Sequence, residues 1–366
     1  MLLLIPGPVM TRPEVKDAMA VDLAPWDPEF REFAARLRKR ILLLAGGVEG
    51  AHSALPLQGC GHFVTEAALR TFLPPGGRIL VPMTGAYAER MVRLAREAGR
   101  VPVPLPIDQE RPIDPAQVAA ALEADARITH AGIVYSETGS GVVCDAPAVG
   151  RAVRQAGRRM ILDAVSAFGA LPWSMEEQPE TDAVVFTANK CLEGMPGLAF
   201  AIAPVERLEA CAGNAGSWSL DLADIHANSL RWGPGSSRFT PPAQVMNALG
   251  TALDLLEQEG GPAARLARYR DNMRVLYEGV LGLGLTPYLA REAQGPVIVN
   301  VRAPAVTGWD LQAFVRALKR RDVLISNFYN TPEPSFRVGC IGAITPQDMA
   351  FAVEAIGAAL AELGAG

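Results

Sequence analysis

The run R-M-I-L-D-A at residues 159–164 and the run H-A-G-I-V-Y-S at residues 130–136 decide the fold class of this chain. Both are almost continuously apolar, as is typical of strands that are buried on both faces of a mostly parallel sheet. Outward from these runs, short apolar segments alternate with amphipathic ones, which predicts an α/β architecture with a mostly parallel seven-stranded sheet. We expect strands at 52–58, 78–82, 101–105, 130–135, 160–164, 183–188 and 198–203, and helices at 62–73, 86–98, 115–124 and 145–156.

The pattern changes after about residue 255. Two long helical stretches, near 242–258 and 262–282, lead into a block with expected strands at 296–302, 323–326 and 335–339 and expected helices near 308–321 and 346–363. This mixture predicts a smaller α+β domain at the C-terminus. The sequence thus divides into an N-terminal arm at 1–20, a large domain at 21–255 and a small domain at 256–366, with a hinge at the glycine pair 260–261.

The composition is that of an ordinary globular protein, with 49% hydrophobic and 20% charged residues among 366. The net charge of -5 comes without long runs of like charge, so we expect neither nucleic acid nor membrane as a partner. The five cysteines form no C-x-x-C pair, which favours free thiols in the cytoplasm over disulfides or a metal site. The apolar start M-L-L-L-I ends at Pro6, too early for a signal segment.

An acid and an amine stand at the ends of two neighbouring predicted strands. Asp163 ends an apolar strand, where open α/β sheets bind ligands, and its carboxylate could hold the protonated pyridine nitrogen of pyridoxal phosphate. Lys190 follows the next apolar strand, where partial burial would lower its pKa and favour imine formation. Taken singly, Asp163 could be a helix cap and Lys190 a surface residue. Their spacing, one strand–helix–strand step, favours a shared site.

Four further stretches carry polar or aromatic residues that suit such a site. In Q-G-C-G-H-F the amides at 61–63 would open a helix and could hold a phosphate, although many such turns bind nothing. Tyr87 could stack on a cofactor ring or pack in the core. Thr138 and Ser140 lie in a glycine turn and could donate hydrogen bonds. Arg337 in S-F-R-V-G could bind a carboxylate or phosphonate, or pair with an acid of the chain.

Together these motifs resemble the class V aminotransferases of fold type I. The resemblance covers nearly the whole chain and rests on these stretches: L-I-P-G-P, A-P-W-D-P, L-Q-G-C-G-H-F-V-T-E-A, G-A-Y-A-E-R-M, S-E-T-G-S-G, D-A-V-S-A-F-G, A-N-K-C-L-E-G-M-P-G, S-W-S-L-D-L, S-R-F-T-P-P and F-R-V-G-C-I-G. The A-N-K-C and S-W-S-L-D-L stretches are most similar to the branch that transfers the amino group of 2-aminoethylphosphonate to pyruvate.

The resemblance implies a role for each candidate residue, with pyridoxal 5'-phosphate as cofactor. Lys190 would form the Schiff base and shuttle the proton, while Asp163 would pair with the pyridine nitrogen. The remaining cofactor contacts would be Gly61, His62 and Phe63 at the phosphate, Val165 and Tyr87 on the two ring faces, and Thr138 and Asn189 beside the ring. Arg337 would bind the acidic end of both the amine and the 2-oxo acid. Such enzymes form homodimers, so Thr240 would reach the partner's phosphate.

Several alternative functions stay open at this point. Departures at Cys60, His62 and Cys340 from the phosphonate pattern point to an alanine– or serine–glyoxylate (or pyruvate) aminotransferase as the runner-up. A cysteine desulfurase or other lyase would need a nucleophilic cysteine on a mobile loop, which the contexts of Cys191 and Cys340 do not suggest. A protein that only binds the cofactor would not need both Asp163 and Lys190. A nicotinamide-binding protein is excluded because no G-x-G-x-x-G opens the first strand–helix unit.

Overall fold

The computed structural model describes residues 1–329 and 331–364, and it is built around a seven-stranded sheet. In order across the sheet the strands are β2 (His52–Gly59), β8 (Gly197–Pro204), β7 (Thr181–Thr187), β6 (Arg159–Asp163), β5 (Ile128–Val134), β3 (Arg78–Pro82) and β4 (Val101–Leu105). All neighbouring pairs are parallel except the two that involve β8. The α/β fold with a mostly parallel seven-stranded sheet is therefore confirmed.

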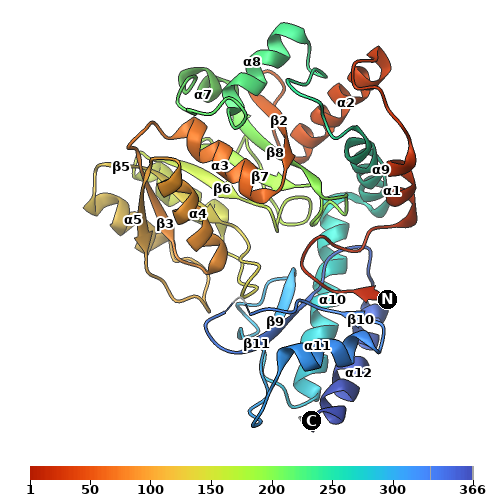
Figure 1. Ribbon diagram of the computed structural model, residues 1–366. Coiled ribbons are helices and arrows are strands. Elements are labelled where there is room, and N and C mark those ends of the chain that lie inside the picture. The colour runs from red at the N-terminus through yellow and green to blue at the C-terminus, as the bar shows by residue number, and fades with distance from the viewer. Residues whose placement is uncertain (330, 365–366) are drawn as a thin grey trace.

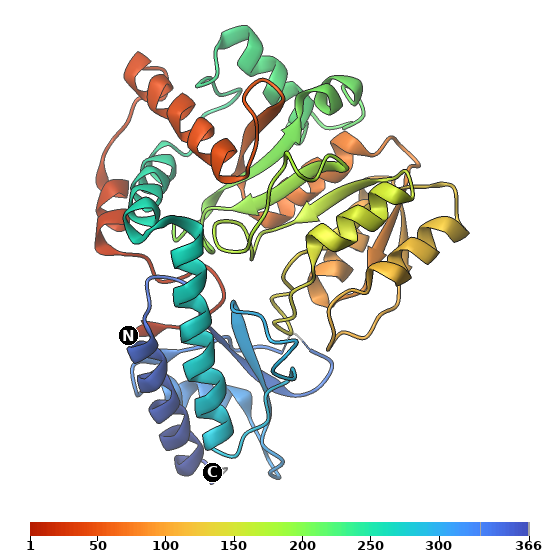
Figure 2. The ribbon, with the colours of Figure 1, turned by 180° about the vertical axis from the view of Figure 1, so that it is seen from behind.

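Helices cover both faces of this sheet (Figures 1 and 2). One apolar core lies under α2 (Pro28–Leu44), α5 (Pro115–Ala124), α6 (Ala146–Gln155) and α9 (Ala243–Glu259). A second core lies on the opposite face under α3 (Gly61–Phe72), α4 (Ala86–Glu97), α7 (Val205–Ala210) and α8 (Leu222–Trp232). The two cores explain why the strands are apolar at almost every position, because each side chain meets a helix layer on its own face.

Aspartate caps begin several of these helices. Asp114 and Asp145 each accept a hydrogen bond from a first-turn amide, and a proline follows within two residues of each cap. The same signal, Asp27 followed by Pro28, begins α2, which is absent from the helices expected above. Also absent from them are α1 (Pro13–Asp17), α7 and α8, of which α8 begins at the double cap of Asp221.

The C-terminal part has its own small sheet and core. Its elements are α10 (Gly261–Gly282), β9 (Ile298–Arg302), α11 (Leu311–Lys319), β10 (Val323–Leu324), β11 (Ser335–Gly339) and α12 (Pro346–Glu362). β9 and β11 pair antiparallel, and α10, α11 and α12 pack around them. The predicted order of elements is confirmed, although the strand expected at 323–326 ends at Leu324 and the helix expected from 308 begins only after its cap, Asp310.

The N-terminal residues join this C-terminal core. β1 (Leu2–Leu3) pairs in parallel with β10, and Leu2 and Leu4 are buried in the same apolar cluster as α11 and α12. The N-terminus therefore lies beside β10 and α12, although these elements are far from it in the chain (Figure 1). Gly260 joins these two helices with φ +108°, a left-handed conformation that suits glycine. The boundaries at 20 and 255 and a hinge at 260–261 stay predictions.

Candidate active site

A cavity of about 200 Å³ opens at the carboxyl ends of the central strands. Its lining residues come from the N-terminal segment, from the starts of α3 and α4, and from the segments that follow β6 and β7. They are Gly7, Cys60, Gly61, His62, Thr65, Tyr87, Arg90, Met91, Leu94, Asp163, Val165, Thr187, Asn189 and Lys190. This is the edge at which open α/β sheets bind ligands, because the loops there converge from several strands.

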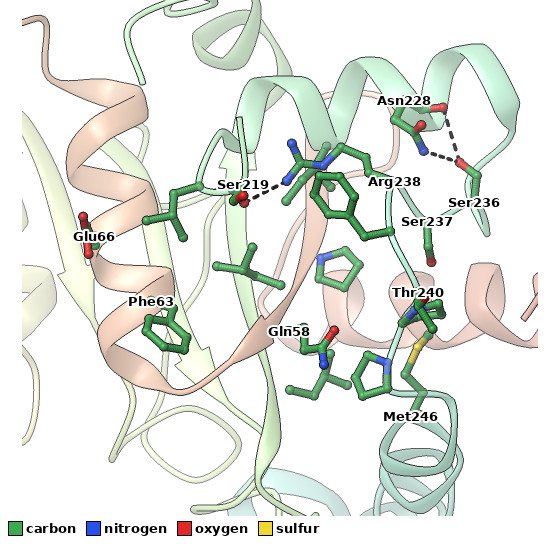
Figure 3. A pocket seen from close by; sticks show the side chains of 18 residues that line it. Gln58, Phe63, Glu66, Ser219, Asn228, Ser236, Ser237, Arg238, Thr240 and Met246 are labelled. Atoms are coloured by element: carbon green, nitrogen blue, oxygen red, sulfur yellow. Dashed lines mark hydrogen bonds between the residues drawn. The ribbon is translucent and has the colours of Figure 1, made fainter. Parts of the chain in front are cut away.

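The cavity brings together most of the residues that the sequence singled out. Seven of them line it: Gly61, His62, Tyr87, Asp163, Val165, Asn189 and Lys190. Arg337 lines an adjoining cavity of about 370 Å³ that shares Gly7, Tyr87, Arg90 and Lys190 with the first. Phe63 and Thr240 lie elsewhere, in a groove of about 430 Å³ on the outer side of α3 (Figure 3).

Asp163 is the last residue of β6 and is 9% exposed. Its Oδ1 accepts a hydrogen bond from the Val165 amide at 3.0 Å, which fixes the carboxylate at the strand end. Burial raises the pKa of Asp163 to about 6, while the Val165 amide and the Lys190 amine act in the opposite direction. A carboxylate in this setting gains strongly from a cationic hydrogen-bond donor, because pairing would offset the cost of burial.

Lys190 stands three residues beyond β7 and is 7% exposed. Burial lowers the pKa of its amine to about 8, and the positive charge of Arg337 contributes in the same direction. The N-terminal segment packs closely against the side chain, since a Cβ on Gly7 would lie 2.6 Å from Lys190 Cε. A buried lysine with a depressed pKa is the form in which this residue acts as nucleophile or base.

The start of α3 presents amide groups to the cavity. Gly61 and His62 are the first two residues of the helix, and their amides precede the first intrahelical hydrogen bonds. The Phe63 amide already donates to the Cys60 carbonyl at 3.1 Å, and the Phe63 side chain lies in the outer groove. A Cβ on Gly61 would lie 3.0 Å from Val165 Cγ2, so a side chain there would crowd the cavity floor. A helix start of this kind suits an anion.

Arg337 reaches the site from β11 and is 4% exposed. Its Nη1 donates to the Thr138 carbonyl at 2.8 Å, its Nε donates to Ser326 Oγ at 3.2 Å, and its guanidinium lies over the Phe328 ring. Thr138 thus contacts the site through its backbone, while its hydroxyl pairs with Ser166 Oγ at 2.6 Å. Burial lowers the pKa of Arg337, which nevertheless stays cationic.

Arg90, Thr187 and Glu137 lie in or beside the site and were not singled out in the sequence. Arg90 lines both cavities, and its guanidinium lies 4.6 Å from the centroid of the Tyr87 ring. The two residues are three apart on α4, a spacing that places side chains next to each other on a helix. Thr187 ends β7, and its Oγ1 is buried with no hydrogen-bond partner among the described residues. Glu137 follows β5 and accepts hydrogen bonds from the Tyr87 and Gly139 amides, while burial raises its pKa to about 7. An acid just beyond an apolar strand was a signal that the sequence offered.

The alternatives that need other chemistry find little support around the cavity. Burial raises the pKa of the Cys191 thiol to about 12 and that of Cys340 further, so neither is a ready nucleophile.

Within 1–329 and 331–364, no group of three His, Cys, Asp or Glu side chains could hold a metal ion. No helix among the described residues is both long and apolar enough to cross a bilayer.

Comparison with known proteins agrees with this geometry. The sequence model of the class V aminotransferases matches residues 49–331. A 2-aminoethylphosphonate–pyruvate transaminase of Burkholderia lata is 40% identical over 99% of this chain and 96% of its own length. A protein of the same name from Pseudomonas putida is 36% identical over 99% of this chain and 97% of its own length.

Two solved structures share the fold over essentially the whole chain. Pyridoxamine–pyruvate aminotransferase from Mesorhizobium loti has a TM-score of 0.91 and 26% identity, and the match covers 100% of this chain and 93% of that one. An aspartate aminotransferase from Thermus thermophilus has a TM-score of 0.86 and 26% identity, over 99% of both chains. These matches confirm the expected fold type I architecture. The chain accordingly belongs to the class V aminotransferase family.

Proposed function

We propose that this protein transfers the amino group of 2-aminoethylphosphonate to pyruvate, giving phosphonoacetaldehyde and alanine in two half-reactions. It is an aminotransferase of class V that uses pyridoxal 5'-phosphate and takes an amine and a 2-oxo acid as substrates. The observation that carries the proposal is the convergence of Asp163, Lys190 and Arg337 on two adjoining cavities beside the start of α3. The relatives that are 36–41% identical are all named as 2-aminoethylphosphonate–pyruvate transaminases, which supports the phosphonate as donor.

The residues of the cavity fit the cofactor. Asp163 would hold the pyridine nitrogen, the amides at 61–63 the phosphate, and Val165 and Tyr87 the two faces of the ring. Two features of the chain support this fit: the buried Thr187 Oγ1 without a partner among the described residues, and the close approach at Gly61, where a Cβ would lie only 3.0 Å from Val165 Cγ2. Thr138 and Asn189 would lie beside the ring. When bound, the cofactor supplies an aldehyde and an electron sink.

Lys190 is the residue that moves protons. With a pKa of about 8, its Nζ is neutral in a useful fraction of molecules at neutral pH, and a neutral amine can act as nucleophile and as general base. The buried carboxylate of Asp163 would favour a protonated ring nitrogen when the cofactor is bound, because an uncharged ring would leave this anion buried without a cationic partner.

Arg337 explains how one site accepts two different substrates. Its planar guanidinium is held by Ser326 and the Thr138 carbonyl, so it is oriented before substrate arrives. Phosphonate and carboxylate are both anions that such a fork can bind in two-point fashion. We propose that the phosphonate of the donor and the carboxylate of pyruvate use Arg337 in turn.

The donor is tested by a coupled assay of alanine formation. 2-Aminoethylphosphonate, serine, glycine and taurine are compared as donors, with pyruvate and glyoxylate as acceptors. We expect the highest kcat/KM with the phosphonate and pyruvate. Higher activity with serine or glycine and glyoxylate would establish the runner-up, an alanine– or serine–glyoxylate aminotransferase, which the presence of His62 in the cavity lining favours.

We further propose that the enzyme is a homodimer joined across the outer groove of α3 (Figure 3). Large apolar side chains are exposed along this face: Phe63, Trp218 and Phe239 in and beside the groove, and Trp26 and Trp232 in the hollow next to it. Exposed aromatic residues of this kind are enriched at protein interfaces. A second copy is the occupant we favour, since Thr240 lines the same groove and could then approach the partner's phosphate.

Sedimentation of the holoenzyme tests the dimer. The Phe239→Glu variant should shift toward monomer and lose activity, because a charge would be buried at the interface. Leu281→Glu is the matched control, since Leu281 is similarly exposed at the end of α10, away from the groove residues. A monomeric, fully active parent enzyme would refute the proposal. The cytoplasm remains our predicted location, supported by five cysteines that are all free.

A further inference from the structure

A buried ionic cluster contacts the turn that carries Lys190. It consists of Glu193, Glu259, Arg265, Arg268 and Tyr269, the last four from the end of α9 and the first turns of α10. Arg265 is 1% exposed and Tyr269 is fully buried. Glu193 is also buried, while Arg268 and Glu259 are partly buried. Removing these charges from water is costly unless they pair with one another and are hydrogen-bonded in good geometry.

The backbone at Glu193 has an unusual conformation. Its φ of +56° is left-handed, and apart from Asp322 no other described residue with a side chain has a positive φ. This conformation is unfavourable for a residue with a Cβ, so the surroundings must enforce it. It turns the chain back so that the Gly194 amide donates to the Ala188 carbonyl at 2.8 Å. The Glu193 amide itself donates to the Lys190 carbonyl at 2.9 Å, so both ends of the segment that carries the reactive amine are closed.

Three members of the cluster, Arg265, Arg268 and Tyr269, supply the enforcing contacts. Glu193 Oε1 accepts hydrogen bonds from the Tyr269 hydroxyl and from Arg268 Nη2, both at 2.7 Å. Arg265 Nη1 donates to the Cys191 carbonyl at 2.7 Å, so the turn is held both through its side chain and through its backbone. Each contact spans more than seventy residues of sequence, and none of them involves the cavity itself.

The same cluster also holds the segment that follows Arg337. Arg268 Nη1 donates to the carbonyls of Gly342 and Ile344 at 2.6 and 2.9 Å, and the Gly342 amide donates to the Tyr269 hydroxyl at 3.3 Å. Residues 340–344 continue directly from β11, on which Arg337 stands. Arg268 and Tyr269 therefore contact both the turn that carries Lys190 and the segment that follows Arg337.

We propose that Glu193 is a positioning residue for the reaction. Held by Arg268 and Tyr269, its side chain keeps the backbone of residue 193 left-handed and thereby keeps the turn 190–193 in place. This turn fixes the position of the Lys190 amine relative to Arg337. This inference rests on the role proposed above for Lys190. Glu193 touches neither cavity, so its effect is exerted through the turn alone. A misplaced amine would meet the substrate in poor geometry and would also be less buried.

Three variants test the proposal. Glu193→Gly permits the left-handed backbone but removes the carboxylate that holds it, Glu193→Gln keeps the shape and the hydrogen bonds, and Tyr269→Phe removes one donor. Glu259→Gln is the matched control, because Glu259 pairs with Arg265 and Arg268 but, in the described part of the chain, makes no hydrogen bond or ion pair with residues 190–193. Two readouts are taken besides thermal unfolding: the kcat and KM of the holoenzyme, and the pH profile of Lys190 labelling by an amine reagent in cofactor-free protein.

We expect Glu193→Gly to lower kcat by roughly tenfold or more and to move the labelling profile of Lys190 toward higher pH, as the amine becomes more exposed. Glu193→Gln should restore most of both properties. Glu259→Gln should lower the unfolding temperature while leaving kcat and the labelling profile close to those of the parent. Equal effects of Glu193→Gly and Glu259→Gln on all readouts, or an unchanged profile in Glu193→Gly, would overturn the proposal.

Failure of the positioning role can be told apart from failure of the proposed function. If Glu193→Gly fails to fold, Tyr269→Phe is compared with Glu259→Gln in its place. Loss of the Tyr269 hydroxyl leaves no buried charge unpaired, because Glu193 still pairs with Arg268. If Lys190→Ala retains turnover, the proposed function itself fails. If Lys190→Ala is inactive while Glu193→Gly and Tyr269→Phe behave like Glu259→Gln, only the positioning role is refuted.

Discussion

The depressed pKa of Lys190 leads to a quantitative prediction about its reactivity. At pH 7 an amine with a pKa of about 8 is neutral in about one tenth of the molecules, whereas an ordinary lysine at 10.5 is neutral in about three per ten thousand. The site therefore raises the neutral fraction by about 300-fold. Burial is the larger cause of this shift, and the charge of Arg337 is the next.

Replacing Arg337 by Gln separates these two causes. The variant keeps a polar, hydrogen-bonding side chain but removes the charge, so the pKa of Lys190 should rise above about 8 and remain below 10.5 because burial persists. At pH 7 the neutral fraction of Lys190 should fall several-fold. Arg337→Lys, which keeps the charge, is the control and should leave the pKa of Lys190 near its original value.

Competitive labelling of cofactor-free protein measures this directly. The rate of reaction of each lysine with an amine reagent is followed by peptide mass spectrometry between pH 6 and 11, and the midpoint of the rate profile gives the pKa independently of access to the amine. Lys16 and Lys39 are exposed and serve as internal references. A midpoint for Lys190 near 10.5 would refute the argument from burial. An unchanged or lower midpoint in Arg337→Gln would refute the contribution of Arg337.

Three further predictions concern the cofactor and substrate sites. The pKa of Asp163 is raised to about 6 in the folded protein, so cofactor-free protein should lose on the order of 3 kcal/mol of stability as the pH rises from about 4 to 6. Unfolding titrations of Asp163→Asn should show a flatter dependence of stability on pH, and an unaltered dependence would contradict the argument. Gly61→Ala should weaken retention of pyridoxal phosphate in dialysis, because its Cβ would lie 3.0 Å from Val165, whereas Gly282→Ala, with open space around it, should not; equal retention would count against the site. Arg337→Gln should raise KM for both substrates by about tenfold or more, and a rise for only one would show that they do not share Arg337.

The order of strands and helices followed from local pattern. Parallel strands with two covered faces are apolar throughout, and amphipathic helices must lie between them, so the elements around Asp163 and Lys190 could be read without three-dimensional information. The helices that were missed, such as α2 and α8, contribute to the same cores but follow irregular segments rather than strands. Their aspartate caps at Asp27 and Asp221 were visible in the sequence and were not used.

Other features depended on residues that are distant in the chain. The burial of the N-terminal residues, with Leu2 and Leu4 in the C-terminal core, required knowledge of β10. The expectation for Phe63 concerned its backbone amide and stays a prediction, whereas the place of its side chain in the outer groove became visible only in the structure. Arg90 enters the site only because α4 begins at the same edge as α3.

The sequence by itself determined which functional groups lie together. An acid and an amine at the carboxyl ends of neighbouring parallel strands come to the same edge of the sheet, independently of the conformation of the loops. Only the tertiary structure decided how reactive and how firmly held these groups are. The pKa of Lys190 depends on burial, to which the distant Gly7 segment contributes, and on the charge of Arg337, while the left-handed backbone at Glu193 depends on partners in α10. Electrostatic and steric effects of this kind act through space over a few ångströms, and proximity in space is what a linear pattern of residues does not contain.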